Sequence, residues 1–145
     1  IFIGGEIEYR MVRLRESLIG FQVRDVVSRH FLSLDVRCSM ADAITLMSEY
    51  PSQDILLIDE RGVRGIITPD VIRKLARKKR SDEPLYDHCI FNPTILQAEW
   101  LLEEYSDMIY QVPQNIFPIL DRDILIGVID RRNIQEAIAW KRLKI

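Results

Sequence analysis

Few of the residues that build catalytic and metal centres are present in this sequence. It has two cysteines and two histidines in 145 residues, and neither histidine lies in a His-Glu-x-x-His pattern. Two cysteines are too few for a disulfide framework, which indicates a reducing compartment. We interpret Cys38 and Cys89 as small buried apolar residues. Because no P-loop, nucleophile elbow or Rossmann glycine pattern occurs either, we expect no catalytic residues and no metal ligands.

A long hydrophobic run and a strong net charge are also missing. The apolar stretch at the start is only Ile1–Ile3, whereas a helix that crosses a bilayer needs about 20 residues. Because the chain begins with Ile rather than Met, we expect it to be part of a longer polypeptide. The net charge of −2 gives no overall reason to expect a nucleic acid or an anionic membrane surface as partner.

The basic run at residues 73–80 is the one local exception to this charge balance. A nucleic-acid patch would have aromatic residues among its basic ones. This run contains none, and acidic residues follow it directly. Basic residues also stabilise the C-terminal end of a helix. We therefore interpret the run as a solvated helix end and expect no nucleic-acid partner.

The sequence does contain an internal repeat, in residues 54–72 and 116–134. Each stretch has an apolar strand, a polar turn, a second strand with a glycine, and a helix start. Three pairs of residues in the two stretches are separated by the same 62 positions: Asp59 and Asp121, Gly65 and Gly127, and Ile67 and Ile129. Such self-similarity predicts two copies of one supersecondary unit. Between these anchors we expect the halves to drift, the second being shorter before its first helix and longer after it.

Capping residues predict where the helices of both halves begin. In the first half, Ser39 with Asp42 forms a capping-box pattern, and Thr68 with Pro69 is a helix-start pair. In the second half we expect a helix capped by Thr94. The remaining expectations are a helix over residues 6–18, strands at 34–36, 55–58, 63–67, 116–120 and 124–129, and a last helix from about residue 131. Each repeat then has the order β-α-β-β-α, in an α/β fold.

The helix expected at residues 6–18 has an apolar stripe at helical spacing, formed by Ile7, Met11, Leu14 and Leu18. Two roles remain open for it. It covers the edge of the domain, or it continues as a coiled connection to a preceding segment.

Together, the repeat and the segment Gly65-Ile-Ile-Thr68 that opens a helix resemble a tandem pair of cystathionine-β-synthase (CBS) domains, over about residues 23–140. The resemblance implies a connector at residues 1–20, a first repeat at 21–82 and a second at 83–145. It also implies a pseudo-twofold disc that commonly forms homodimers and binds adenine nucleotides or related adenosyl ligands between its repeats. Possession of this fold implies a regulatory module that is not itself an enzyme.

The ribose-binding pattern of that family is Gly-x-x-Thr/Ser-x-x-Asp, and this sequence departs from it in both repeats. In the first, Thr68 matches, but Val71 stands at the acidic position and Asp70 lies one residue early. In the second, Asp130 replaces the hydroxyl residue and Asn133 replaces the aspartate.

The candidate ligand-binding residues are therefore Thr68, Asp70, Asp130, Arg131, Arg132 and Asn133. For AMP, ADP or ATP we expect the second repeat to be the better site. There Arg131 and Arg132 would hold phosphate at a helix N-terminus.

A weaker resemblance concerns the start of the chain. Residues 4–20, leading into Val23-Arg-Asp25, are similar to the segment that joins the last membrane helix of some prokaryotic site-2-protease-type zinc metallopeptidases to their CBS pair. It implies a membrane metalloprotease as the parent protein and a location on the cytoplasmic side of the membrane; otherwise the module is cytoplasmic. The alternative to a ligand sensor is a structural dimerisation module without a small ligand.

Overall fold

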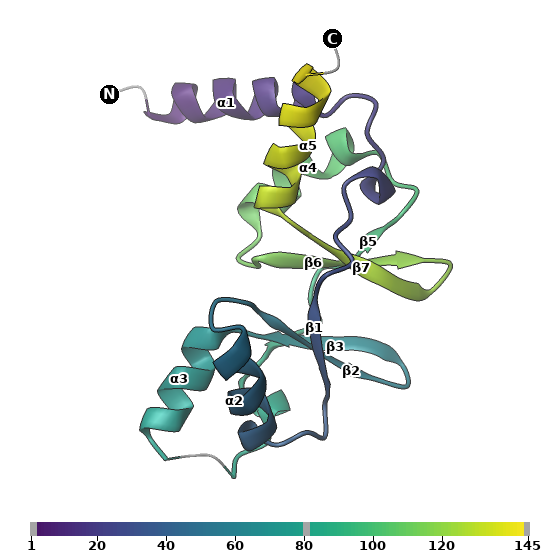
Figure 1. Ribbon diagram of the computed structural model, residues 1–145. Coiled ribbons are helices and arrows are strands. Elements are labelled where there is room, and N and C mark those ends of the chain that lie inside the picture. Colours follow the sequence, from purple (N-terminus) through teal and green to yellow (C-terminus); the bar gives the residue numbers. More distant parts are fainter. Residues whose placement is uncertain (1–2, 80–81, 144–145) are drawn as a thin grey trace. The chain divides into compact units, whose positions relative to one another are not determined.

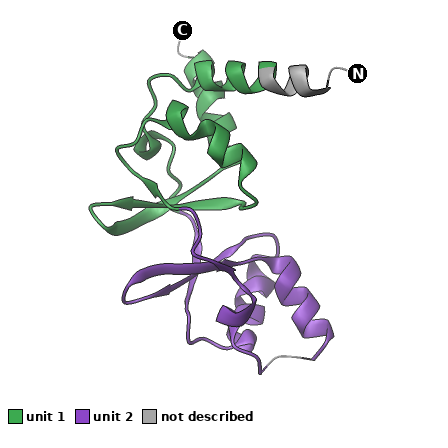
Figure 2. Cartoon of the chain, turned by 180° about the vertical axis from the view of Figure 1, so that it is seen from behind, with its two compact units in different colours: residues 1–29, 95–145 green, residues 30–94 purple. Residues whose placement is uncertain are grey.

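The computed structural model describes residues 3–79 and 82–143, with side chains from residue 9 onward. The chain divides into two compact units (Figure 2). Unit 1 consists of residues 1–29 and 95–145, and unit 2 consists of residues 30–94. Unit 2 is thus inserted into unit 1. The predicted repeat boundaries at 21–82 and 83–145 do not coincide with these units and remain a prediction about the sequence repeat.

Unit 2 is a four-stranded sheet with helices on one face (Figure 1). Its elements are β1 (Leu32–Asp35), α2 (Met40–Glu49), β2 (Ile55–Asp59), β3 (Gly62–Ile67), α3 (Pro69–Arg77), the 3-10 helix η2 (Leu85–His88) and β4 (Ile90–Phe91). The strand order is β1-β2-β3-β4, with β1 parallel to β2 and the other neighbours antiparallel. Residues 55–57 of β2 are completely buried, as an apolar run without alternation predicts.

Local sequence signals explain most of the element boundaries in unit 2. The Ser39 hydroxyl accepts a hydrogen bond from the backbone N–H of Asp42, and the Asp42 carboxylate accepts one from the N–H of Ser39. This confirms the predicted capping box, which stabilises a helix start by satisfying two otherwise unpaired donors. Thr68 is the N-cap of α3, with Pro69 at its first position. Gly62 has a φ of +110° in the turn between β2 and β3, a conformation that favours glycine.

Unit 1 has a three-stranded sheet with the order β5-β6-β7, in which β5 is parallel to β6 and β6 is antiparallel to β7. Its elements are α1 (Ile3–Ser17), the 3-10 helix η1 (Val23–Asp25), β5 (Leu96–Gln97), α4 (Leu102–Gln111), β6 (Ile116–Asp121), β7 (Ile124–Asp130) and α5 (Arg131–Leu143). Figure 1 shows α4 and α5 on one face of this sheet. Each unit has its own cluster of buried apolar side chains.

The segment before the first strand of each repeat joins the sheet that holds the other repeat's β-hairpin. Ser28, which precedes the first repeat, forms an antiparallel bridge to Val128 of β7. In the same way, Ile90 of β4 pairs with Ile66 of β3. Both pairs are equivalent under the 62-residue offset. This exchange is the reason why the compact units differ from the sequence repeats.

The prediction of a helix capped by Thr94 is wrong. Residues 96–97 form β5, where Leu96 is buried and pairs with Ile119 of β6. The helix α4 begins only at Leu102, and its N-cap Leu101 makes no side-chain cap bond. Strand pairing and burial outweigh the local capping pattern here.

The expected drift between the two halves is also wrong. The helices α2 and α4 begin at Met40 and Leu102, and α3 and α5 begin at Pro69 and Arg131. Both pairs are 62 positions apart, so the period holds along the whole repeat.

The apolar stripe of α1 packs inside unit 1. Leu18 is fully buried in the core of this unit, and Leu14 packs against the same core. Arg15 of α1 forms an ion pair with Asp107 of α4. Ile7 lies outside the described side chains. These contacts favour the first of the two predicted roles, in which α1 covers the edge of the domain.

Candidate functional site

The first candidate site lies at the start of α3, in unit 2. The half-buried hydroxyl of Thr68 accepts a hydrogen bond from the N–H of Val71 at 3.5 Å, which is at the long end for such a bond. Because this bond is long, the hydroxyl can still bind a ligand hydroxyl group. Pro69 has no N–H to offer to an anion.

The carboxylate of Asp70 lies on the solvent side of the same helix start. Its side chain is 95% exposed and forms an ion pair with Arg73 at 3.1 Å. Arg73 also donates to the carbonyl oxygen of Pro51. Asp70 therefore introduces negative charge at this helix start, which its ion pair with Arg73 partly balances.

The second candidate site lies at the start of α5, in unit 1. The Asp130 carboxylate accepts a hydrogen bond from the N–H of Asn133 at 2.7 Å, and Asn133 Oδ1 accepts one from the N–H of Asp130 at 2.9 Å. The two side chains thus form a reciprocal cap like that of Ser39 and Asp42. Because the carboxylate already occupies the end of the helix, an anion would have to compete with it.

The two arginines at the start of α5 are bound within unit 1. The guanidinium of Arg131 donates to the carbonyl oxygens of Ile109 and Val112, at 2.9 and 3.2 Å, and lies over the ring of Tyr110. Arg132 forms an ion pair with Glu136 at 3.2 Å. Arg131 therefore stabilises the C-terminal end of α4. Both bonds come from Nη2, so the Nε and Nη1 groups of Arg131 are not used by them.

The six candidate residues thus form two groups, each described within its own unit. Thr68 and Asp70 are neighbours at the start of α3 in unit 2, and the other four surround the start of α5 in unit 1. Whether either group binds a ligand remains a prediction.

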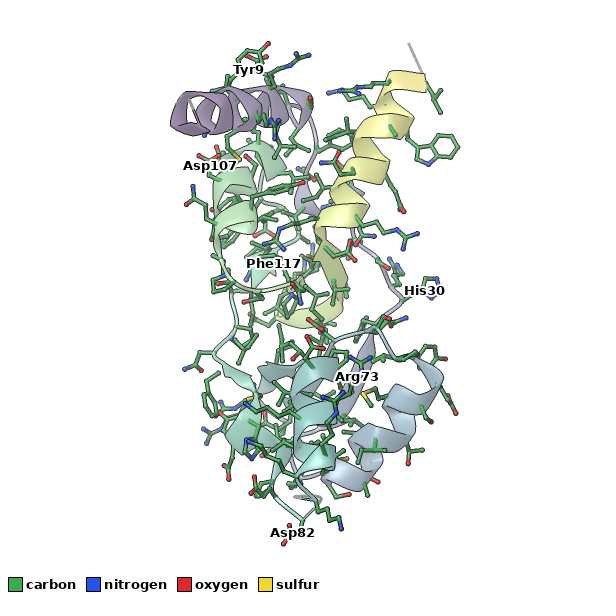
Figure 3. The ribbon with its side chains drawn as sticks, turned by 90° about the vertical axis from the view of Figure 1, so that its left-hand side faces the viewer. Tyr9, His30, Arg73, Asp82, Asp107 and Phe117 are labelled. Atoms are coloured by element: carbon green, nitrogen blue, oxygen red, sulfur yellow. The ribbon has the colours of Figure 1, made fainter. Side chains whose placement is uncertain are left out.

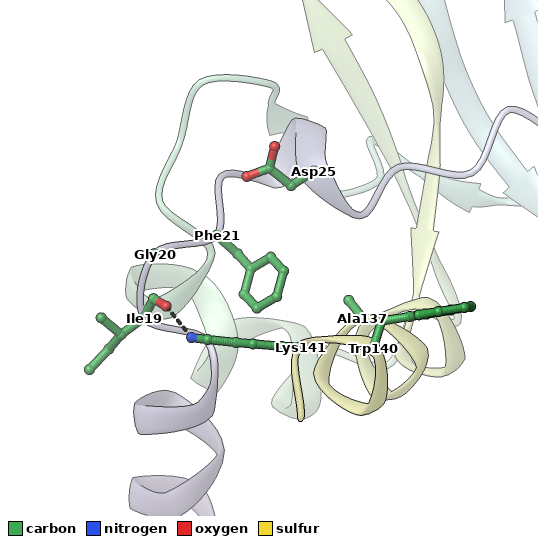
Figure 4. Close-up of a pocket in the computed structure, with 7 residues that line it drawn as sticks. All are labelled: Ile19, Gly20, Phe21, Asp25, Ala137, Trp140 and Lys141. Atoms are coloured by element: carbon green, nitrogen blue, oxygen red, sulfur yellow. Dashed lines mark hydrogen bonds between the residues drawn. The ribbon is translucent and has the colours of Figure 1, made fainter. Parts of the chain in front are cut away.

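Unit 1 also has a hollow that the sequence did not predict (Figure 4). Its volume is about 490 Å³, and it lies between the end of α1, η1 and α5. The lining residues are Ile19, Gly20, Phe21, Asp25, Ala137, Trp140 and Lys141. The Lys141 ammonium group donates to the carbonyl oxygen of Ile19 at 2.7 Å and lies 5.2 Å from the centre of the Phe21 ring. The lining residues at 19–25 are more than 100 positions away from those at 137–141. No local sequence pattern could therefore have predicted that they meet.

Two titratable groups outside these sites have shifted pKa values. Hydrogen bonds from Arg37 lower the pKa of Asp35, at the end of β1, from 3.8 to about 2. Burial raises the pKa of the Cys89 thiol. Cys38 and Cys89 are free thiols, both partly buried against the core of unit 2.

The described part of the chain contains neither a cluster of metal-binding side chains nor a membrane-spanning helix. Within residues 3–79 and 82–143, no group of three or more His, Cys, Asp or Glu side chains could hold a metal ion. In the same part of the chain, no helix is both long and apolar enough to cross a membrane.

Solved structures with the same fold include several CBS pairs. The CBS-pair protein CBSX2 from Arabidopsis thaliana has a TM-score of 0.71 and 20% sequence identity, covering 85% of this chain and 98% of that chain. The structure of CBSX2 in complex with AMP gives a TM-score of 0.72 at 18% identity, over 85% of this chain and 99% of that one. The CBS domain pair of protein MJ0100, in complex with 5'-methylthioadenosine and S-adenosyl-L-methionine, has a TM-score of 0.68 at 15% identity, over 83% of this chain and 98% of that one.

A relative among the curated proteins is the A-adding tRNA nucleotidyltransferase of Aquifex aeolicus, which is 25% identical over 126 residues. The match covers 86% of this chain but only 15% of that enzyme. This chain thus corresponds to a small part of that protein.

The family model of the CBS domain matches residues 23–78, which include the Gly65–Thr68 segment. The second half repeats the elements of the first at a constant offset of 62 residues. The structures with the same fold are CBS pairs along nearly their whole length. Residues 23–78 therefore match the CBS domain, and the chain as a whole has the fold of a CBS pair.

Proposed function

We propose that this chain is the regulatory part of a larger protein and that it binds a small ligand with an adenosyl group. It performs no catalysis itself. Two of the solved structures that share its fold hold such ligands, AMP in one and 5'-methylthioadenosine with S-adenosyl-L-methionine in the other. Ligand binding would then bias the activity of the attached or partner protein through the difference in affinity between two states.

The observation that carries this proposal is the position of Thr68. It follows the buried Gly65 of β3 by three residues and caps α3 with a long hydrogen bond. A hydroxyl group in this position can exchange hydrogen bonds with a ribose hydroxyl, since both are donor and acceptor.

The charges at the two helix starts favour an adenosyl ligand without a phosphate chain. Among the described residues there, Arg73 is paired with Asp70, Arg131 is bound to two carbonyl oxygens, and Arg132 is paired with Glu136. Phosphate groups bind best where guanidinium groups are available. We therefore expect 5'-methylthioadenosine or S-adenosylmethionine to bind more tightly than ATP.

Calorimetric titration of AMP, ATP, 5'-methylthioadenosine and S-adenosylmethionine tests this proposal. Thr68→Val removes the hydroxyl group at nearly constant volume, and we expect a loss of affinity of about tenfold, the effect of one hydrogen bond. The matched control is Thr45→Val, which removes the hydroxyl group of Thr45, an exposed residue of α2. Equal affinities of the Thr68→Val variant and the wild type would rule out Thr68 as a ligand contact.

The predicted phosphate site at Asp130–Asn133 has its own variant in the same experiment. If these arginines hold phosphate, Arg131→Ala/Arg132→Ala should lower the affinity for AMP and ATP but leave the affinity for 5'-methylthioadenosine unchanged. Unchanged affinity for every nucleotide would remove that site.

The second candidate function is a structural dimerisation module without a small ligand. It is favoured by the departures from the ribose pattern, because the apolar Val71 cannot replace a carboxylate that accepts two hydrogen bonds. No heat with any of the four compounds, together with a dimer in sedimentation, would establish this function instead.

The identity of the attached protein is a further part of the proposal. The similarity of residues 4–20 to a membrane metalloprotease connector favours such a parent, with the module on the cytoplasmic side. The curated relative has a tRNA nucleotidyltransferase activity in its name and is far longer than the matched region. Both cases fit a module that regulates a separate catalytic domain.

A further inference from the structure

The hollow of unit 1 has the lining of a small-ligand site. Its volume of about 490 Å³ lies in the range of about 300–1,000 Å³ that is usual for ligand pockets. The apolar side chains in its lining are those of Ile19, Phe21, Ala137 and Trp140. Asp25 and Lys141 add one carboxylate and one ammonium group. Ligand pockets are commonly built in this way, with apolar walls and a few polar groups that orient the ligand.

The apolar wall of this hollow is largely open to solvent. Ile19 is 53% exposed and Trp140 65%. The ring of Phe21 is half-buried, and Figure 4 shows it between the side chains of Asp25 and Lys141. A ligand with an apolar body would remove part of this wall from water, which favours binding.

The internal repeat shows that the fold does not need aromatic residues at these positions. The 3-10 helices η1 and η2 begin 62 positions apart, and so do α5 and α3. At the same offset, Phe21 corresponds to Glu83 and Trp140 to Lys78. Unit 2 thus forms the equivalent elements with charged residues where unit 1 has aromatic ones. The aromatic wall of unit 1 therefore has a reason other than folding, and binding is such a reason.

Both charged groups of the hollow retain hydrogen-bonding capacity. The Lys141 ammonium group has three donors, and one of them binds the carbonyl oxygen of Ile19 at 2.7 Å. Oδ2 of Asp25 accepts a hydrogen bond from the N–H of Gln22 at 2.8 Å, and a carboxylate has about four acceptor positions. Among the described residues, neither side chain forms an ion pair. Each can therefore bind a ligand group of opposite charge.

The walls of the hollow are held in place by contacts within unit 1. The ion pair between Arg15 and Asp107 fixes α1 to α4, and Figure 3 shows Asp107 next to α1. Leu18, at the end of this helix, is fully buried. The bond from Lys141 to Ile19 ties α5 to the turn after α1. A site that is already formed loses less conformational entropy when a ligand binds.

We propose that this hollow binds an amino acid with an apolar side chain. The carboxylate of the ligand binds the Lys141 ammonium group, and its ammonium group binds the Asp25 carboxylate, both through charge-assisted hydrogen bonds. The side chain of the ligand lies against Trp140 and Ile19, where an aromatic or branched group gains most from burial. Because residues 137–141 lie more than one helical turn beyond Arg131, this site is separate from the candidate adenosyl site at the start of α5.

The opposite charges of Asp25 and Lys141 favour a zwitterion over other small ligands. A fatty acid or another simple carboxylate would use Lys141 but leave Asp25 without a partner. A simple amine would do the reverse. A nucleotide would bring its phosphate charges next to the Asp25 carboxylate, which repels them.

Calorimetric titration of the full chain tests the proposal with ligands that differ by one charged group. The ligands are L-phenylalanine, 3-phenylpropionate, which lacks the ammonium group, and phenethylamine, which lacks the carboxylate. We expect L-phenylalanine to bind at least about tenfold more tightly than either analogue, because each analogue loses a charge-assisted hydrogen bond. L-Leucine should also bind, whereas L-aspartate, with a second carboxylate, should not.

Two variants test the charged residues, and the internal repeat supplies their controls. Lys141→Met and Asp25→Asn remove one charge each at nearly constant size, and each should lower the affinity for L-phenylalanine about tenfold or more. The controls Lys79→Met and Asp87→Asn change the equivalent exposed residues of unit 2 and should leave this affinity unchanged. Melting followed by circular dichroism checks that all four variants fold.

The apolar wall is tested through Trp140. Trp140→Ala keeps both charged groups and should also lower the affinity for L-phenylalanine. Trp140 and Trp100 are the only tryptophans of the chain, so a Trp100→Phe background isolates the fluorescence of Trp140. In this background L-phenylalanine should change the emission of Trp140, with the same affinity as in calorimetry.

Three outcomes would overturn the proposal. They are no heat and no fluorescence change with millimolar L-phenylalanine or L-leucine, equal affinities for L-phenylalanine and its two analogues, and equal affinities of Lys141→Met and Lys79→Met. The Thr68→Val variant should bind L-phenylalanine normally. Failure of the adenosyl-ligand proposal and failure of this one are therefore distinguishable.

Discussion

Asp130 and Asn133 cap α5 reciprocally, each side chain accepting a hydrogen bond from the other residue's backbone N–H group. Two positions at which the CBS ribose pattern has ligand-binding residues thus stabilise a helix end in this chain. Removal of either side chain leaves a backbone N–H group at the helix end without its partner. We therefore expect each removal to change the stability of the fold as well as the affinity for any ligand bound there.

We predict that Asp130→Ala lowers the free energy of unfolding by about 1 kcal/mol, the usual effect of losing an N-cap residue. Asn133→Ala should have a similar but smaller effect. Urea denaturation of the two single variants and the double variant gives their coupling. Because the two bonds share one helix end, the double variant should lose less than the sum of the single losses. Strict additivity would contradict the reciprocal cap.

A second prediction concerns Gly127 of β7. A Cβ atom at this position would collide with the backbone carbonyl oxygen of Ser28 and lie 2.7 Å from a methyl group of Val27. The Ser28 segment is held by hydrogen bonds to Val128 and cannot move away easily. We expect Gly127→Ala to destabilise the protein by about 1–3 kcal/mol, as overpacking does, in urea denaturation.

The equivalent Gly65 provides a comparison for Gly127. There a Cβ atom would stand 2.5 Å from the Cys89 sulfur, and the nearest backbone atom, the Ile90 carbonyl oxygen, is 3.1 Å away. Since a side chain is the main obstacle, we expect Gly65→Ala to be partly rescued by Cys89→Ala. No comparable truncation should rescue Gly127→Ala. A full rescue of the latter by Val27→Ala would show that the backbone contact is not the cause.

A third prediction follows from Asp35 and Arg37 at the end of β1. The Arg37 side chain donates two hydrogen bonds to the Asp35 carboxylate, at 2.8 and 2.9 Å, and the pKa of Asp35 falls from 3.8 to about 2. The stability from this pair is therefore fully present above pH 4 and is lost as the pH falls toward 2. Arg37→Ala should return the pKa of Asp35 close to 3.8 in an NMR titration of the carboxyl carbon. A pKa that stays near 2 would place the cause elsewhere.

A fourth prediction concerns fragments of the chain. Residues 30–94 contain all four strands of the unit 2 sheet and its core, so we expect them to fold cooperatively alone. The sequence repeat at residues 21–82 lacks β4 and retains a segment whose hydrogen-bond partners, Trp100 and Val128, are absent. Thermal melting followed by circular dichroism should give a lower melting temperature for 21–82. Equal stability of both fragments would contradict the exchange of segments.

Much of the fold could be predicted from the sequence because its signals are local. Ser39, Thr68 and Pro69 mark helix starts through their own side chains, and Gly62 marks a turn through its backbone conformation. The start of α4 lacks such a signal, since Leu101 offers no side-chain cap. Adding the constant offset of 62 residues to Met40, where α2 begins, gives the correct start of α4 at Leu102.

The candidate site was less predictable, because residue type does not show which contact a side chain makes. Arg131 follows the strand β7 as a phosphate-binding arginine would, yet its guanidinium group binds carbonyl oxygens at the end of α4. That choice depends on where Ile109 and Val112 lie in space. The hollow of unit 1 has the same origin, because Ile19 and Lys141 are 122 positions apart in the sequence and meet only in the folded unit.

The insertion of unit 2 into unit 1 also decides how the chain would respond to mechanical tension. Both ends of the described chain belong to unit 1, and the chain enters and leaves unit 2 near residues 29 and 95. A force pulling the two ends apart therefore acts first across unit 1, where Ser28 is bound to Val128 and Val23 to Trp100. Unit 2 carries no tension until those hydrogen bonds break. It is therefore protected from a force applied to the ends of the module.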